Sequence, residues 1–67
     1  MKGQVIDAGD IENIAVINGD DGERYYFPIS EWKSHAKLQR GMQVDFDSNG
    51  KDAYAVYAES DFSKPSQ

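Results

Sequence analysis

Residues 11–29 read IENIAVINGDDGERYYFPI, and this segment decides the fold. Two strand-like runs, residues 13–18 and 23–29, flank the turn sequence GDDG of residues 19–22. Aspartate tolerates the tight backbone of a turn and glycine supplies a positive φ, while aromatic side chains favour strands. Pro28 has no N–H to donate to a neighbouring strand, so the second run must end there or lie at an edge. The segment therefore predicts a β-hairpin.

Three more segments are strand candidates, and they surround a long connection. Residues 3–7 form a short candidate near the N-terminus. In residues 42–47 apolar and polar side chains alternate, which is typical of a strand with one buried face. The turn sequence DSNG then leads into a last candidate, residues 53–58. Between the hairpin and residues 42–47 the sequence predicts a helical turn with Ser30 as its N-cap, followed by a polar, basic connection.

Five short strands with a long third-to-fourth connection predict an all-β fold, a small five-stranded antiparallel OB-fold barrel with a short helical turn after strand three. Closure into a barrel hides the strand edges that a flat sheet of this size would expose. Trp32 is expected to plug the barrel beneath the connection. We assign residues 1–58 to this domain and residues 59–67, which lack periodicity, to a disordered tail. The expected core consists of Val5, Ile17, Tyr25, Phe27, Val44 and Phe46.

The direction of the side chains in the last strand is ambiguous. One alternation buries Tyr54 and Val56, and the other buries Ala53, Ala55 and Tyr57. Because side chains of a strand point to opposite faces in turn, a single strand without irregularities follows one alternation or the other. The sequence leaves both open.

Length and composition limit the classes of function. A chain of 67 residues makes one domain at most. It has no cysteine, in keeping with a cytoplasmic, reducing location, and no apolar stretch near the roughly 20 residues of a membrane helix. Seven Lys and Arg residues against twelve Asp and Glu residues give a formal net charge of −5. This balance argues against strong, charge-driven binding of nucleic acid, although a local basic patch can act within an acidic protein.

The whole predicted domain resembles the bacterial cold-shock domain, an OB-fold barrel that binds single-stranded RNA. The matching elements are Met1-x-Gly3-x-Val5, the apolar strand ending in Ile17, Asp20-Asp21-Gly22, Phe27, Ser30, Gly41-x-x-Val44-x-Phe46 and an alanine-bearing last strand. In that family, strands two and three carry two motifs whose exposed aromatic side chains stack on unpaired bases. The resemblance implies the same barrel here.

The chain departs from the family at the stacking positions. The first motif, typically Lys-Gly-Phe-Gly-Phe, is occupied by residues 12–16 with the sequence ENIAV. The aromatic end of strand one is replaced by Asp7-Ala8. In the second motif Tyr26 keeps an aromatic ring, but the following His-Phe pair becomes Pro28-Ile29. The resemblance therefore implies the barrel and one stacking platform rather than the usual RNA-binding surface.

If the family's geometry holds, an apolar patch lies on the outside of the barrel. Its members would be Ile14, Val16, Tyr26, Pro28 and Ile29. Large exposed apolar patches on small proteins mark contacts with other proteins or with membranes. Two other interpretations are open: a facing shifted by one residue would place these side chains in the core, or the long connection or the tail covers them.

The candidate chemical groups each have a simpler explanation. Asp20, Asp21 and Glu23 lie in a turn and lack the spacing of a calcium loop. His35 has no second ligand or nucleophile beside it in the sequence, and no Gly-x-Ser-x-Gly elbow or phosphate loop is present. The basic residues of the connection are interpreted either as a phosphate contact or as a solvated loop. We expect no catalytic residue, no metal site and no cofactor.

The sequence supports two functions, and we favour the first. In the first, the outer face of a non-catalytic module contacts protein, which is another subunit, a second copy or an adjoining domain of a longer chain. In the second, Tyr26 and the basic connection bind single-stranded nucleic acid weakly. The residues predicted to bind are Ile14, Val16, Tyr26, Pro28, Ile29, Lys33, Lys37 and Arg40.

Overall fold

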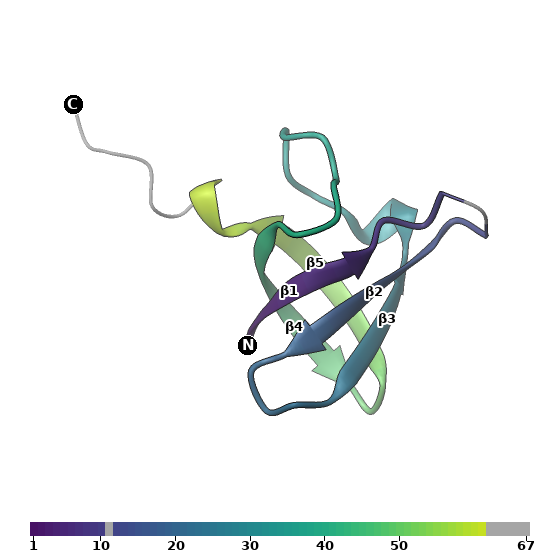
Figure 1. Ribbon diagram of the computed structural model, residues 1–67, viewed down its shortest axis with the longest axis vertical. Coiled ribbons are helices and arrows are strands. Elements are labelled where there is room, and N and C mark those ends of the chain that lie inside the picture. Colours follow the sequence, from purple (N-terminus) through teal and green to yellow (C-terminus); the bar gives the residue numbers. More distant parts are fainter. Residues whose placement is uncertain (11, 62–67) are drawn as a thin grey trace.

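The computed structural model describes residues 1–10 and 12–61 (Figure 1). Five strands and two short 3-10 helices make up this part of the chain. Their bounds are β1 Lys2–Asp7, β2 Ile14–Gly19, β3 Arg24–Pro28, η1 Ile29–Glu31, β4 Gln43–Asn49, β5 Asp52–Ala58 and η2 Glu59–Asp61.

The strands form a closed barrel in the order β1-β2-β3-β5-β4. The all-β barrel and the helical turn after strand three are confirmed, and the topology is consistent with a small OB-type barrel. One part of the prediction needs correction: β3 and β5 pair in parallel, whereas the other pairs are antiparallel. A closed ring with an odd number of strands cannot alternate direction all the way round, so one parallel pair is unavoidable.

The core of the barrel contains every side chain that the sequence predicted for it. Val5, Ile17, Tyr25, Phe27, Val44 and Phe46 are all buried, together with Ala15, Ala53, Val56 and Ala58. Trp32 is partly buried against this cluster, and its Nε1–H donates a hydrogen bond of 2.8 Å to the carbonyl oxygen of Ala36 in the long connection. The expected position of Trp32 beneath that connection is therefore confirmed.

A β-bulge in β5 resolves the ambiguous alternation of the last strand. Asp45 pairs with Tyr57 and Asp47 with Tyr54, so β5 uses one residue more than β4 over the same span. Ala55 has a φ of 51°, and its N–H donates a 3.1 Å hydrogen bond to Oε1 of Glu31 in η1. The extra residue reverses the facing of the rest of the strand. Neither predicted alternation holds along the whole strand, because Ala53 precedes the bulge and Val56 comes after it, and both are buried.

Two predictions about the ends of elements are wrong in detail. The first concerns Ser30, which is not an N-cap: η1 begins at Ile29, and the N-cap position is Pro28, which makes no side-chain capping hydrogen bond. The N–H of Ile29 donates instead to the carbonyl oxygen of Asn13 at 3.0 Å, so the backbone of the β1–β2 loop does what a capping side chain would do.

The second concerns the end of the domain, because the chain stays ordered past the predicted boundary. Residues 59–61 form η2 rather than a disordered tail, and Oε2 of Glu59 lies 3.3 Å from Nζ of Lys2. This ion pair connects the end of the fold to its first strand. The remainder of the predicted tail, residues 62–67, lies outside the described residues. Within the described part, no helix is both long and apolar enough to cross a membrane.

Candidate binding face and groove

The outward side chains of β1, β2 and β3 are arranged in rows across the strands, which lie side by side in Figure 1. One row is polar and consists of Gln4, Asn18 and Arg24. The next consists of Asp7, Val16, Tyr26 and, across the parallel pair, Asp52. The last pairs Ile14 with Pro28. The face therefore becomes more apolar toward the end where β2 begins and β3 ends.

Four of the five residues predicted for the outer patch lie on this face. Ile14 is 41% exposed and Tyr26 is 44% exposed, Pro28 is exposed and Val16 is half-buried. The alternative of a shifted facing is excluded, because the inward positions of the same strands hold the core residues. Ile29 lies elsewhere: it is partly buried in η1 and packs against the core.

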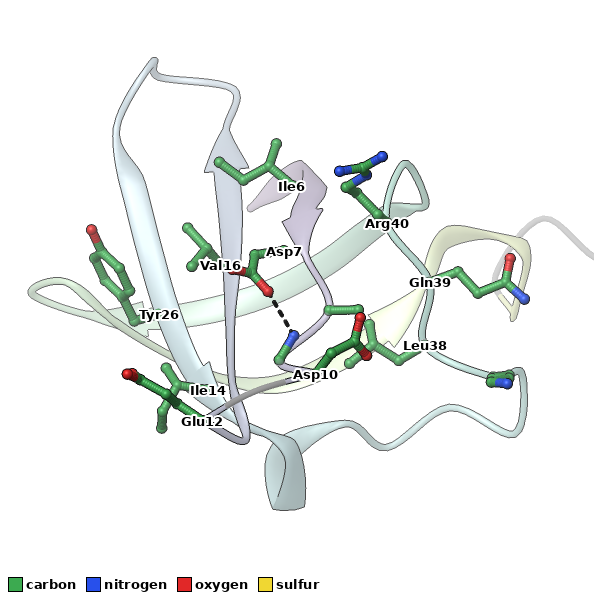
Figure 2. Close-up of a pocket in the computed structure, with 13 residues that line it drawn as sticks. Ile6, Asp7, Asp10, Glu12, Ile14, Val16, Tyr26, Leu38, Gln39 and Arg40 are labelled. Carbon is green, nitrogen blue, oxygen red and sulfur yellow. Dashed lines mark hydrogen bonds between the residues drawn. The ribbon is translucent and has the colours of Figure 1, made fainter.

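A second bulge adds Ile6 to the face. Val5 pairs with Ile17, but Asp7 pairs with Val16, so β1 has one residue more than β2 at this point. Ile6 is the additional residue, and Figure 2 shows its side chain on the same side of the sheet as that of Val16. The sequence analysis missed Ile6. The alternation of residues 3–7 could have predicted its direction, because the residue after an inward Val5 points outward.

An open groove of about 980 Å³ runs along the apolar part of the face. Its floor is formed by Ile6, Ile14, Val16 and Tyr26 on the strands. The β1–β2 loop forms one wall and the connection between η1 and β4 forms a second wall, for which Figure 2 shows Leu38, Gln39 and Arg40. The full lining is Ile6, Asp7, Ala8, Gly9, Asp10, Glu12, Ile14, Val16, Tyr26, Lys37, Leu38, Gln39 and Arg40.

The β1–β2 loop is held in place by packing beneath it. Gly9 is buried with a φ of 76°, and a Cβ atom there would lie 2.8 Å from Cδ1 of Ile29. The carbonyl oxygen of Gly9 accepts a 3.1 Å hydrogen bond from the N–H of Asn13. Asp7 closes the turn, since its Oδ1 accepts a 2.8 Å hydrogen bond from the N–H of Gly9 (Figure 2). Ile29 thus supports this wall of the groove without lining it.

The second wall, formed by the connection between η1 and β4, is anchored at both of its ends. At its start, the N–H of Lys33 donates to the carbonyl oxygen of Val56 at 2.8 Å. At its end, the N–H of Gly41 donates to the carbonyl oxygen of Val5 at 2.7 Å, and the N–H of Val5 donates to that of Met42 at 2.9 Å. These two hydrogen bonds place Arg40, which precedes Gly41, next to β1.

The structure brings together five of the eight residues predicted to bind, namely Ile14, Val16, Tyr26, Lys37 and Arg40. Pro28 adjoins them on the face but does not line the groove. Lys33 lies apart, and its Nζ is 3.5 Å from the carbonyl oxygen of Ser30. Besides Ile6, the groove is lined by Leu38, Asp10 and Glu12, which the sequence analysis did not include among the binding residues.

The groove offers apolar contact surface with charges at its rim. Among the side chains that the structure describes, no group of three or more His, Cys, Asp or Glu is placed to hold a metal ion. The described residues also include no buried side-chain nitrogen or oxygen that lacks a hydrogen-bond partner. The arrangement suits the binding of an amphipathic ligand.

Comparison with known proteins adds no assignment: no family model matches the chain, and no curated protein matches it. The resemblance to the cold-shock domain therefore remains a prediction from the sequence. The barrel topology supports the predicted fold, and the face and the groove are the features that bear on function.

Proposed function

We propose that the chain is a non-catalytic binding module of cold-shock type whose outer sheet face contacts protein. The observation that supports this proposal is the outward, adjoining arrangement of Ile14, Val16, Tyr26 and Pro28. Ile14 and Tyr26 are two of the few large apolar side chains that remain exposed in the described part of the chain. Burying a large apolar side chain completely contributes about 1.5–3 kcal/mol, so a partner that covers this face gains a substantial driving force.

The charges around the groove favour protein over nucleic acid. Three carboxylates line it, those of Asp7, Asp10 and Glu12, against the two cations of Lys37 and Arg40. Nucleic-acid binders obtain much of their affinity by neutralising phosphates with Lys and Arg, and carboxylates at the site oppose this. Apart from Tyr26, the floor is aliphatic and lacks the flat rings on which bases stack.

One observation favours a second function, weak binding of single-stranded nucleic acid. Tyr26 is 44% exposed and lines the same groove as Lys37 and Arg40. A base stacked on an aromatic ring contributes about 1–3 kcal/mol, and neighbouring cations can contact the phosphates. This function predicts that Tyr26→Ala and Lys37→Ala each weaken binding and that affinity falls steeply as salt rises.

Two titrations of the isotope-labelled chain test the proposal, both followed by amide chemical shifts. One uses peptides selected from a random library displayed on phage, and the other uses single-stranded DNA and RNA oligonucleotides. We expect selected peptides to shift signals of β2 and β3 and to lose binding in Val16→Asp. Asn18→Asp is the matched control, because Asn18 is exposed on the same outward side of β2 in the polar row.

The proposal fails if oligonucleotides shift residues 14–16 and 24–28 at micromolar concentration while no selected peptide binds there. It also fails if Val16→Asp and Asn18→Asp weaken peptide binding equally, because the apolar row would then have no special role. Sedimentation of wild type and Val16→Asp identifies a second copy as the partner if only the wild type self-associates.

A further inference from the structure

Three dipeptides of the chain have the composition at which asparagine and aspartate rearrange most readily. They are Asn18-Gly19, Asp21-Gly22 and Asn49-Gly50. At such a dipeptide the backbone nitrogen of the glycine attacks the side-chain carbonyl carbon of the preceding residue, because glycine has no Cβ to hinder the approach. The dipeptide composition does not rank the two asparagines, so their surroundings in the fold decide which of them reacts.

Asn18-Gly19 is held by neighbours on both sides. Asn18 pairs with Gln4 of β1 and with Arg24 of β3. Gly19 is buried, and its N–H donates a 2.8 Å hydrogen bond to the carbonyl oxygen of Glu23. The attacking nitrogen is therefore engaged, and the side chain reaches it only after the surrounding ladder opens.

Asp21-Gly22 is held by hydrogen bonds of its own. The N–H of Gly22 donates to the carbonyl oxygen of Gly19 at 2.9 Å. Both carboxylate oxygens of Asp21 are also acceptors, from the N–H of Glu23 at 3.0 Å and from the hydroxyl of Tyr25 at 2.6 Å. A carboxyl must be protonated to lose water in this reaction, and the hydrogen bond from Tyr25, followed by that from Glu23, lowers its pKa. This dipeptide is therefore protected at both reacting groups.

Asn49-Gly50 lies in the open, at the turn between β4 and β5. Asn49 pairs with Asp52 of the same hairpin, at the end of the ladder, and Gly50 follows outside the paired residues. Both Asn49 and Gly50 are exposed, and a Cβ atom at Gly50 would meet nothing within 4 Å. In the part of the chain that the structure describes, the N–H of Gly50 donates no hydrogen bond. Opening of this last pair is therefore enough to release both reacting groups.

We infer that Asn49 is a spontaneous modification site, at which asparagine is converted to aspartate and isoaspartate. The backbone nitrogen of Gly50 gives its proton to a base in the solvent and forms a bond to Cγ of Asn49. The bond between Cγ and the side-chain nitrogen breaks, and that nitrogen takes a proton from the solvent and leaves as ammonia. Water then opens the cyclic imide at either carbonyl carbon, which yields aspartate or isoaspartate. The inference is independent of the proposed function, because the turn does not line the groove.

The turn is attached to the strand that carries Tyr26. The carbonyl oxygen of Lys51 accepts a 2.9 Å hydrogen bond from the N–H of Tyr26, and Nζ of Lys51 lies 2.6 Å from Oε1 of Glu23. Figure 1 shows the β4–β5 turn beside the start of β3. Isoaspartate adds a methylene group to the backbone, and the length of a tight turn sets the register of its strands. The isoaspartyl form is therefore expected to release the amide of Tyr26, whereas the aspartyl form keeps it.

Ageing of the intact chain at mildly alkaline pH and 37 °C tests the inference. Trypsin cleaves after lysine and arginine, so Asn49 is recovered in residues 41–51 and Asn18 in residues 3–24. Mass spectrometry of the two peptides measures the conversion of amide to carboxyl, and methyl transfer by an isoaspartyl methyltransferase measures isoaspartate. We expect residues 41–51 to convert at least about tenfold faster, because Asn18 reacts only after a hydrogen-bonded ladder opens on both of its sides.

Unfolding provides a matched control, because both asparagines precede glycine. In urea the ladder is absent, so the two peptides should convert at similar rates. Asn49→Gln should stop conversion of residues 41–51, since the longer side chain closes a larger and less favourable ring, and Asn18→Gln should leave it unchanged. Both positions are exposed, and the amide spectrum of each variant verifies its fold.

The inference is overturned if residues 3–24 convert as fast as residues 41–51 in the folded chain, or if urea leaves the ratio of the two rates unchanged. It is also overturned if residues 41–51 stay unmodified in the folded chain while a free peptide of the same sequence is converted.

Hydrogen exchange at the amide of Tyr26 tests the structural consequence, after chromatography has separated the modified chains. Faster exchange in the isoaspartyl form than in freshly prepared Asn49→Asp supports it, because the two forms share a charge and differ in backbone length. Equal exchange would show that the turn absorbs the added methylene group, which overturns the effect on β3 and leaves the modification site in place.

Discussion

The two faces of β2 carry similar apolar side chains, but one face belongs to the core and the other lies on the surface. Ala15 and Ile17 point inward and are completely buried, whereas Ile14 and Val16 point outward and line the groove. Composition does not distinguish the two sets. Closure of the barrel does, because it encloses one face of every strand and leaves the other to solvent or to a partner.

β3 shows the same contrast between two adjacent tyrosines. Tyr25 is 6% exposed, and its ring packs 5.2 Å from that of Phe46, measured between centroids. Tyr26 is 44% exposed and lies in the row with Val16. Apolar burial inside the barrel stabilises the fold, while similar side chains outside remain available for binding. Substitutions on the two faces should therefore have different consequences.

The largest difference is expected between Ile17→Ala and Ile14→Ala. Ile17 is 0% exposed, so its truncation should lower the free energy of unfolding by about 2–5 kcal/mol. The total free energy of unfolding of a chain of this length is roughly 3–10 kcal/mol, so this variant is expected to be partly unfolded at 37 °C. Ile14→Ala should cost less than about 1 kcal/mol, because the site is exposed. Urea denaturation followed by Trp32 fluorescence measures both, and equal losses would contradict the division between the faces.

The wall of the groove depends on packing from beneath, which Gly9→Ala should reveal. The new methyl group would lie 2.8 Å from Cδ1 of Ile29 and would force a φ of 76° on alanine. Gly22→Ala is the control, because its φ is 85° but nothing lies within 4 Å of the added atom. We expect a loss of about 1–2 kcal/mol from backbone strain in Gly22→Ala and about 1–3 kcal/mol more in Gly9→Ala. Thermal unfolding of the pair decides this, and similar losses would mean that the loop does not pack on Ile29.

The bulge that turns Val56 inward should depend on Glu31. Its carboxylate accepts the hydrogen bond from the N–H of Ala55, so Glu31→Ala should cost about 1 kcal/mol and speed hydrogen exchange at that amide. Glu31→Gln keeps a carbonyl acceptor and should cost less. Unchanged exchange at Ala55 in Glu31→Ala would show that the bulge is maintained by the strands alone.

The smallest effect concerns pH and the inward tyrosine. The hydroxyl of Tyr25 donates a 2.6 Å hydrogen bond to Oδ2 of Asp21, which lowers the pKa of that carboxyl below its usual 3.8, and the N–H of Glu23 lowers it further. A carboxyl whose pKa is lower in the folded state stabilises the fold above pH 3.8, and this contribution is lost as the pH falls through the lowered pKa.

Tyr25→Phe should therefore lose less stability than wild type between pH 6 and pH 2. Tyr26→Phe is the control and should follow the wild-type curve, because the outward hydroxyl is not bonded to Asp21. Urea midpoints across this pH range measure the difference. A wild-type acid dependence in Tyr25→Phe would mean that the hydrogen bond does not contribute.

Much of the barrel is predictable from local pattern. The hairpin, the turns at GDDG and DSNG and the alternation of residues 42–47 identify strands to within about two residues of their observed ends. Alternation along the first four strands predicts all six expected core residues correctly, because each strand of a closed sheet has one face that points into the core. The outward direction of Ile14, Val16 and Tyr26 results from the same periodicity.

The bulges and the groove could not be derived in that way. A bulge is a mismatch between two paired strands, so the extra residues Ile6 and Ala55 are defined only relative to β2 and β4. The path of the connection past β1 is likewise set by hydrogen bonds to Val5, a residue far away in the sequence.

The amino-acid sequence by itself determined which residues form strands and which six large side chains enter the core from the first four strands, because turn chemistry and a period of two act between near neighbours. Only the tertiary structure decided that residues of the β1–β2 loop and of the connection line the same groove, and that β3 and β5 run in parallel. Those features arise from closure of the barrel, which depends on pairings between distant segments that no local pattern encodes.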